Sequence, residues 1–169
     1  GPTTRRLFVR ALDSALPRLL EGTDGASAPF WSPDGNWVAF FAQGKLKKIP
    51  VTGGEAVSIC DAADNTGGMG GSWGSTGTIV FALPGSARAG LMRVSASGGA
   101  PERLTNPDPK QGGGHGNPFV TDDGRTVVFT TRTTSVQVAA SIVARSLVTG
   151  EEHTITEGSG GAVMTPAFT

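Results

Sequence analysis

One phrase recurs along this chain, and its repetition constrains the fold more than any single residue does. The first copy, Pro-Phe-Trp-Ser-Pro-Asp-Gly at 29–35, precedes an apolar segment at 38–41. Another copy, Pro-Phe-Val-Thr-Asp-Asp-Gly, occupies 118–124, and a weaker one, Gly-Ser-Trp-Gly-Ser-Thr-Gly, occupies 71–77. The closing glycines, Gly35, Gly77 and Gly124, are 42 and 47 residues apart. Four-stranded propeller blades repeat about every 40–50 residues.

A second phrase alternates with the first. Its copies are Lys-Ile-Pro-Val-Thr-Gly-Gly-Glu at 48–55, Arg-Val-Ser-Ala-Ser-Gly-Gly-Ala at 93–100 and Arg-Ser-Leu-Val-Thr-Gly-Glu at 145–151. Residues 9–14 resemble a copy that lacks the glycines. This alignment makes Lys48, Arg93 and Arg145 equivalent. A short strand is predicted after each copy, at 18–20, 57–59, 103–105 and 154–156.

Each repeat unit is predicted to form four antiparallel strands. In Ser-Pro-Asp-Gly, proline sets φ at the first central position and glycine accepts a positive φ, so this phrase forms a tight turn. Gly44 then turns the chain into the partly alternating strand at 45–49, and Thr-Gly-Gly closes the last hairpin. The segment 136–143 is rich in β-branched residues and is predicted to be a strand. Such sheets must stack on neighbours to bury their faces.

The predicted fold is therefore all-β: a partial β-propeller in one domain, with about four blades' worth of four-stranded antiparallel sheets. The content of turn-forming residues, 26 glycines and 11 prolines in 169 residues, agrees with this fold. Because closed propellers typically have 4–8 blades, we expect a fragment of a larger ring. The predicted segments are a cleavage scar or leader at 1–6, two outer strands at 7–26, blades at 27–66, 67–112 and 113–160, and the inner strand of an incomplete blade at 161–169.

Composition narrows the possible functions. Fourteen basic residues balance fourteen acidic ones, which gives no preference for nucleic acid or for an anionic membrane surface. The single cysteine excludes an internal disulfide and a cysteine-cluster metal site. No apolar run approaches the roughly 18 residues of a membrane span. We expect no metal and no cofactor.

With both phrases in place, the chain resembles the WD40-like, TolB-type β-propeller repeats. Residues 30–35, 40–42, 44–47, 59–62, 70–73 and 142–151 look like the C-terminal propeller of bacterial serine/threonine protein kinases. The resemblance covers nearly the whole chain after Arg5. It implies a sensor or protein-interaction module downstream of a kinase domain, often beyond a membrane segment and therefore extracytoplasmic. The kinase signatures themselves are absent, so the resemblance implies no kinase activity.

One motif has the form of a catalytic one. Residues 70–74 fit Gly-x-Ser-x-Gly around Ser72, and Asp122 and His153 follow in the order of a hydrolase triad. A nucleophile elbow requires a strand, a sharp turn and then a helix. The repeat instead places Ser72 on an inner strand with no helix after it. We therefore predict no catalytic residue and expect the protein not to be an enzyme.

The glycine clusters at 67–71 and 112–116 lack the Gly-Lys-Ser/Thr that completes a phosphate-binding loop. We interpret them as connections between units that need a permissive backbone, with a contribution to ligand binding at the pore mouth as the alternative. His115, in the second cluster, precedes an inner strand near the central channel. It is the best single candidate for a ligand contact.

The other polar candidates are assigned structural roles. Asp122 and Asp123 could ligate a hard cation, but Asp34 occupies the matching place in the first turn, so turn capping is predicted. Cys60 is expected to be a small buried residue and His153 to be exposed.

The basic strand and the tryptophans are also interpreted structurally. Lys45, Lys47 and Lys48 are predicted to form a solvated face that discourages edge pairing, with a patch for an acidic partner as the alternative. Trp31 and Trp73 occupy equivalent positions and are predicted to lie in the core between blades.

Two functions remain. The first is a non-catalytic binding, sensor or protein-interaction scaffold with a protein or small-molecule ligand at the ring face. The alternative is the accessory propeller of a prolyl-oligopeptidase-type serine peptidase. For partners, we expect a homo-oligomer in which the C-terminal strand of one chain adds to the N-terminal strands of the next. No nucleic acid and no membrane segment are expected.

Overall fold

The computed structural model describes residues 5–62, 70–83, 89–108, 113–131 and 140–158. Every helix or strand element in these ranges is a β-strand. The N-terminal hairpin, β1 (Phe8–Val9) and β2 (Arg18–Leu19), precedes three four-stranded antiparallel sheets. The predicted all-β fold is confirmed. Residues 1–4 of the predicted segment 1–6, residues 136–139 of the predicted strand 136–143 and the predicted inner strand at 161–169 lie outside the described residues.

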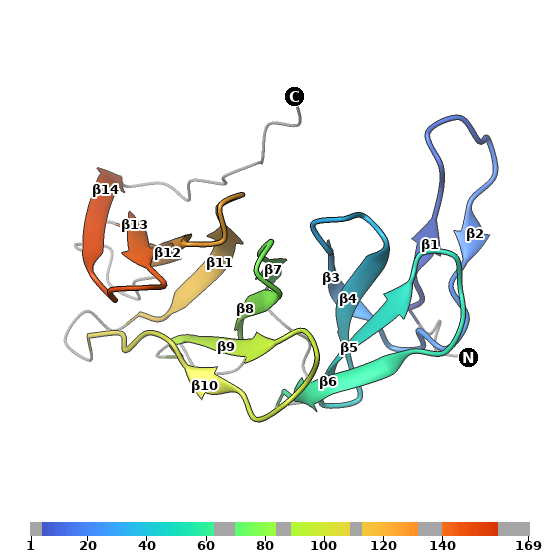
Figure 1. Cartoon of the computed structure of the whole chain (residues 1–169), viewed down its shortest axis with the longest axis horizontal. Coiled ribbons are helices and arrows are strands. Elements are labelled where there is room, and N and C mark those ends of the chain that lie inside the picture. The colour runs from blue at the N-terminus through green and yellow to red at the C-terminus, as the bar shows by residue number, and fades with distance from the viewer. Residues whose placement is uncertain (1–4, 63–69, 84–88, 109–112, 132–139, 159–169) are drawn as a thin grey trace.

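In each four-stranded sheet, the order of the strands in space follows their order in the chain. Figure 1 shows the sheets in an arc, with β3, β7 and β11 toward its inner side. The first sheet contains β3 (Ser27–Trp31), β4 (Trp37–Ala42), β5 (Lys45–Pro50) and β6 (Val57–Asp61). The second contains β7 (Gly71–Trp73), β8 (Thr78–Ala82), β9 (Leu91–Ser95) and β10 (Glu102–Arg103). The third contains β11 (His115–Val120), β12 (Thr126–Thr131), β13 (Ala140–Ser146) and β14 (Glu152–Gly158).

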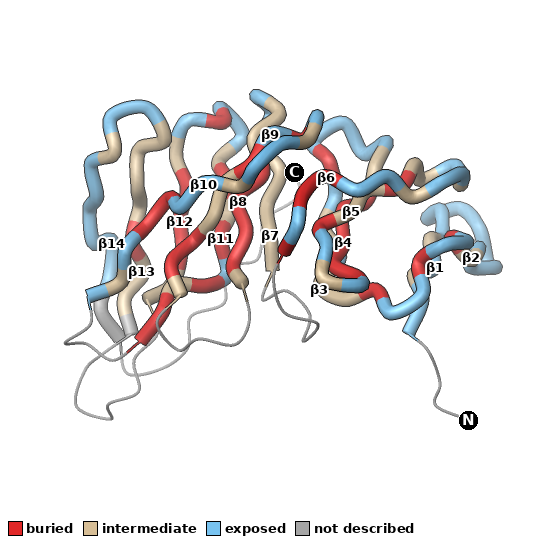
Figure 2. Tube along the Cα trace, turned by 90° about the horizontal axis from the view of Figure 1, so that it is seen from below, coloured by how far each residue is buried: buried red, intermediate tan, exposed pale blue. Residues whose placement is uncertain are grey.

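The second strand of each sheet carries most of the packing between sheets, and Figure 2 shows buried residues concentrated there. Side chains alternate between the two faces of these strands. Phe40, Phe81 and Phe129 occupy equivalent positions, face the preceding sheet and are at most 1% exposed. Full burial of such a side chain contributes about 1.5–3 kcal/mol. The stack of sheets is therefore held together by a repeated apolar layer.

The turn after each inner strand is built as the phrase predicts. In the first sheet, Asp34 Oδ1 accepts hydrogen bonds from Ser32 Oγ at 2.5 Å and from the backbone N–H of Asn36 at 3.0 Å. In the third, Asp123 Oδ1 accepts from Thr121 Oγ1 at 2.6 Å and from the N–H of Arg125 at 3.0 Å. These hydrogen bonds lower the pKa of both carboxyl groups.

Each inner strand has an irregular backbone conformation at the residue three positions before its last residue, which lies in β3 and β11 and directly before β7. Ala28 (φ 46), Gly70 (φ 97) and Asn117 (φ 48) occupy the same repeat position and all have positive φ. In β3 and β11, the pairing register shifts at this point, which indicates a bulge. The neighbouring Gly71 approaches the first sheet closely, because a Cβ there would lie 2.5 Å from the Phe30 ring. Part of the first glycine cluster is thus required by packing; residues 67–69 lie outside the described ranges.

Candidate functional site at the interface of the second and third sheets

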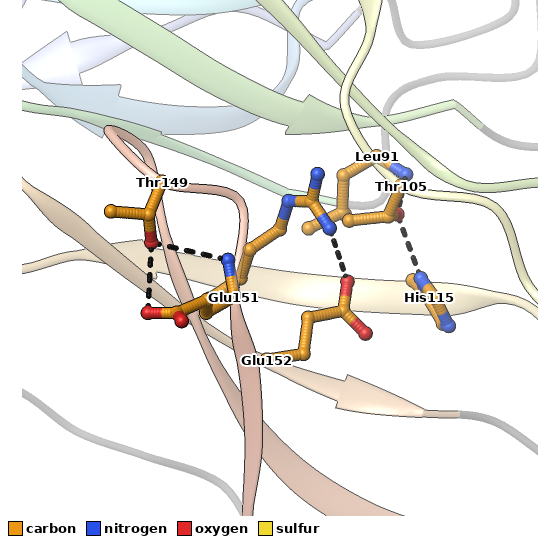
Figure 3. A network of polar contacts seen from close by, with 7 residues as sticks. Leu91, Thr105, His115, Thr149, Glu151 and Glu152 are labelled. Carbon is orange, nitrogen blue, oxygen red and sulfur yellow. Dashed lines mark hydrogen bonds and ion pairs between the residues drawn. The ribbon is translucent and has the colours of Figure 1, made fainter.

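His115 lies between the second and third sheets, at the start of β11 (Figure 3). Its Nδ1 is 2.7 Å from Thr105 Oγ1, which also accepts a hydrogen bond from the N–H of Leu91 at 2.8 Å. The imidazole packs against the Phe129 ring, with 4.8 Å between centroids. The predicted ligand contact is therefore a half-buried residue with polar and aromatic partners on two sheets.

Arg145 and Glu152 form an ion pair close to this histidine. Arg145 Nη1 lies 2.6 Å from Glu152 Oε1 (Figure 3). Burial is the main cause that lowers the pKa of His115; the Arg145 charge adds to this effect and the Glu152 charge opposes it. The neutral imidazole is thereby favoured. Sequence reasoning did not identify this pair as part of the interface.

The strand register shows that the phrase alignment of Arg145 is wrong by one residue. Val127 pairs with Arg145, as Val38 pairs with Ile49 and Ile79 pairs with Val94. Arg145 therefore occupies the place of Ile49 and Val94, which are buried between sheets, rather than that of Lys48 and Arg93.

The cause of this error is the length of the hairpin after β13. Arg145 pairs with Glu152, whereas Lys48 pairs with Val57 and Arg93 pairs with Glu102. The hairpin of the third sheet is shorter, so the shared Val-Thr-Gly letters fall at different positions in its turn. At this position Arg145 Nε is buried, and no described residue is its hydrogen-bond partner.

Ser72 has a structural partner. It lies in β7, and the next element is strand β8, so the surroundings are not those of a nucleophile elbow. Its Oγ accepts a hydrogen bond from the N–H of Val120 at 2.9 Å, which joins the second and third sheets. His153 is an exposed residue of β14, and the Asp122 carbonyl accepts from Ser75 Oγ at 2.8 Å. No hydrogen bond between described residues connects Ser72, Asp122 and His153.

The basic strand β5 is not a uniform solvated face. Lys45 pairs with Asp61 at 2.5 Å, and Lys47 Nζ donates to Gln43 Oε1 at 2.7 Å. Lys48 differs from both, because its Nζ reaches the second sheet and donates to the carbonyl of Ala96 at 2.8 Å. Its ammonium also lies 5.0 Å and 5.8 Å from the ring centroids of Trp37 and Trp73. For Lys48, the prediction of a solvated residue is wrong.

The two tryptophans differ in burial. Trp73 is half-buried and packs against the core between the first and second sheets, whereas Trp31 is 53% exposed. The prediction of a core role for Trp31 is therefore wrong. Trp31 pairs with Val38 and so faces the N-terminal hairpin. In the described residues this hairpin has two strands, and no inner strand covers the indole.

Cys60 is buried in the core between the first and second sheets, as predicted. Burial raises the pKa of its thiol to about 11. The described residues contain no group of three or more His, Cys, Asp or Glu side chains that could hold a metal ion. They also contain no helix long and apolar enough to cross a membrane.

Comparison with known proteins identifies the fold. No protein-family model matches the chain, and no curated protein sequence matches it. Among solved structures, TolB from Acinetobacter baumannii is 16% identical with a TM-score of 0.65, over 91% of this chain and 38% of that one. A putative TolB from Agrobacterium tumefaciens is 19% identical with a TM-score of 0.65, over 83% of this chain and 52% of that one.

A structure from a study of two prolyl endopeptidases is 14% identical with a TM-score of 0.61, over 92% of this chain and 26% of that one. At such identities these likenesses show the fold alone. The chain has a TolB-like, partial β-propeller fold, and it spans about half or less of the length of each of these structures.

Proposed function

We propose that this protein is a non-catalytic interaction scaffold that associates with a second copy to extend its ring. The observation that carries the proposal is the partial exposure of Ile142 on the outer face of the third sheet, which no further sheet covers in the described residues, although Val128 on this face is buried. Ile142 pairs with Thr130 as Leu46 pairs with Phe41 and as Leu91 pairs with Ala82. Leu46 and Leu91 are 0% exposed because the following sheet covers them, whereas Ile142 is only half-buried.

The other end of the arc also exposes apolar side chains. Leu7 and Val9 of the N-terminal hairpin pack toward the first sheet, and Phe8 between them faces the other way and is 62% exposed. Trp31 is exposed beside the same hairpin. Leu12 and Leu16, between its strands, are 101% and 79% exposed. Exposed apolar groups that gather in this way are typical of interaction surfaces.

The two ends of the arc of sheets could complete each other when two copies meet. The N-terminal hairpin supplies two outer strands of a sheet, and at the other end no further sheet follows the third one in the described residues. In our proposal, residues 161–169 of one copy add the inner strand that the N-terminal hairpin of the next copy lacks. Pairing of free strand edges and burial of Trp31 and Ile142 would both favour association.

Size-exclusion chromatography with light scattering tests this proposal. We expect the wild-type protein to have at least twice the monomer mass of 17.2 kDa at micromolar concentration. Ile142→Lys places a charge on the open face and should give a monomer. Val57→Lys, on an exposed residue of β6, is the matched control and should behave as wild type. A wild-type protein that is monomeric at micromolar concentration would contradict the proposal.

The second part of the proposal concerns the kind of larger protein to which the scaffold belongs. The resemblance of the repeats supports a sensor module attached to a bacterial serine/threonine kinase. The likeness to prolyl endopeptidase structures supports the second candidate, the accessory propeller of a serine peptidase. Sequencing the complete gene separates them, since the first requires an upstream kinase domain and the second a downstream α/β-hydrolase domain.

A further inference from the structure

A pocket of about 560 Å³ lies between the second and third sheets, beside the tight turns that follow β7 and β11. Ligand sites commonly have volumes of about 300–1,000 Å³. The lining residues used below are Arg93, Glu102, Arg125, Leu147 and Val148. None of them belongs to the open end faces, so this pocket is separate from the proposed association surface.

Hydrogen bonds and close contacts fix the walls of the pocket. Ser75 Oγ donates to the Asp122 carbonyl at 2.8 Å, which joins the two turns. The N–H of Leu147 donates to the Arg125 carbonyl at 2.7 Å. A Cβ at Gly124 would lie 2.7 Å from Thr76 Cγ2, so the two turns are in close contact. The pocket is therefore formed before any ligand arrives.

The other two interfaces between sheets contain a cationic bridge at the corresponding place. Arg18 of the N-terminal hairpin donates to the carbonyl of Val51, and Lys48 of the first sheet donates to the carbonyl of Ala96. By strand register, Leu147 is the equivalent of Val51 and Ala96. No described residue donates a hydrogen bond to its carbonyl.

Glu102 explains why the bridge is missing here. Arg93 occupies the position of Lys48, but its Nε and Nη2 donate to Glu102 Oε2 at 3.1 Å and 3.0 Å within the second sheet. The cross-strand neighbour of Lys48 is Val57, which has no acceptor in its side chain. Arg93 is thus held away from the third sheet, and the space that a bridge would cross remains open.

The remaining groups define the chemistry of a ligand. Arg93 and Glu102 neutralise each other, whereas the guanidinium of Arg125 has no hydrogen bond or ion pair with a described residue. Arg125 is therefore the lining cation that no ion pair neutralises, and the charge of Asp123 acts on it from outside the lining. Leu147 and the 72% exposed Val148 provide an apolar wall. A complementary ligand has a carboxylate, an apolar side chain and an amide N–H for the Leu147 carbonyl.

We propose that this pocket binds an N-acylated apolar amino acid, either free or as the C-terminal residue of a peptide. The carboxylate pairs with Arg125, the side chain packs on Val148, and the amide N–H takes the place of the cationic bridge at Leu147. Arginine favours carboxylates because its planar guanidinium can donate two parallel hydrogen bonds.

Calorimetric titration of the full chain with N-acetyl-L-leucine, N-acetyl-L-leucinamide and a pentapeptide ending in leucine tests this site. We expect saturable binding of the two acids and roughly tenfold weaker binding of the amide, because a charged hydrogen bond is lost. Tighter binding of the pentapeptide would identify a peptide terminus as the source, and equal binding would identify a free acyl amino acid. No saturable binding of either acid, or equal binding of acid and amide, would overturn the proposal.

Variants locate the binding within the pocket. Arg125→Gln should weaken binding of the acids roughly tenfold, whereas Arg103→Gln, on the neighbouring exposed residue of β10, should leave it unchanged. Glu102→Val reproduces Val57 and frees Arg93 to bridge to the third sheet, so it should abolish binding without loss of thermal stability. Unchanged binding in Arg125→Gln or in Glu102→Val would contradict the assignment. Binding should persist in Ile142→Lys, which separates this test from that of association.

Discussion

At the scale of single residues, His115 couples protonation to the contact between sheets. Its ring is enclosed by Thr105 and Phe129, and burial lowers its pKa below the ordinary value of 6.5. Well above pH 6.5, the imidazole is neutral in both the folded and the unfolded chain, and it makes no contribution to pH dependence. Below pH 6.5, the unfolded chain takes up the proton first. The free energy of unfolding therefore falls as the pH falls toward the lowered pKa of the folded state.

We predict that replacing this histidine reduces the loss of stability on mild acidification. Urea unfolding of the wild-type protein should show a lower midpoint at pH 5.5 than at pH 7.5. In His115→Gln, which keeps an amide able to reach Thr105, the difference between the two midpoints should be smaller. His153→Gln, on an exposed residue, is the control and should keep the wild-type difference. Equal differences in all three proteins would contradict this role of His115.

At the scale of elements, Lys48 connects two sheets through both an ammonium and an aliphatic chain. The ammonium donates to the Ala96 carbonyl and lies near two indole rings, one from each sheet. Cation–π contacts contribute roughly 0.5–2 kcal/mol and a hydrogen bond to a charged group contributes comparably. Lys48 is therefore a structural contact rather than part of a basic surface.

Lys48→Met should lower the free energy of unfolding by about 1–2 kcal/mol, because it removes the charge and keeps most of the aliphatic chain. Lys47→Met is the matched control: Lys47 is adjacent on the same strand and contacts only Gln43 through its Nζ in the described structure. Chemical denaturation at pH 7 measures both variants. Equal effects of the two substitutions would show that the bridge to Ala96 does not stabilise the stack.

The sequence predicts those features of strands and turns that depend on residues close together in the chain. Asp34 and Asp123 cap their turns within three residues of chain, so the repeated phrase identifies both. The phrase also places Ser72 on a strand. Lys48 and Trp31 were misassigned because their surroundings come from another sheet. Arg145 was misplaced because a turn of different length shifts the strand register while the letters of the turn stay alike.

The candidate site was predicted only in part for the same reason. His115 stands out as a histidine beside an inner strand, and this signal is local. Its partner Thr105 follows β10 and Phe129 lies in β12, while Glu152 reaches the interface through an ion pair with Arg145. No single-sequence pattern reports such contacts. The alignment of Arg145 with the buried Ile49 and Val94 would have indicated an unusual charged residue between the sheets. The sequence phrases conceal this alignment, because it requires the correct strand register.

At the scale of the whole molecule, the described residues form an open arc in which internal and terminal faces carry the same pattern. Ile142 occupies the position at which Leu46 and Leu91 are fully buried in the other sheets. Trp31 occupies the position of Trp73, but Trp73 packs against the complete first sheet, whereas Trp31 faces only the two-stranded hairpin in the described residues. A stack of this kind derives its stability from the contacts between neighbouring units. In the proposed association, the units at the two ends would gain such contacts from a second copy.

Association predicts that thermal stability depends on protein concentration. A partner that binds only the folded state raises its stability in proportion to the logarithm of its concentration. The midpoint of thermal unfolding of the wild-type protein should therefore rise between low and high micromolar concentration. Ile142→Lys should remove this dependence, whereas Lys48→Met should lower the midpoint at every concentration and keep the dependence. If the wild-type midpoint were constant over this range, the terminal sheets would have to be stable without a second copy.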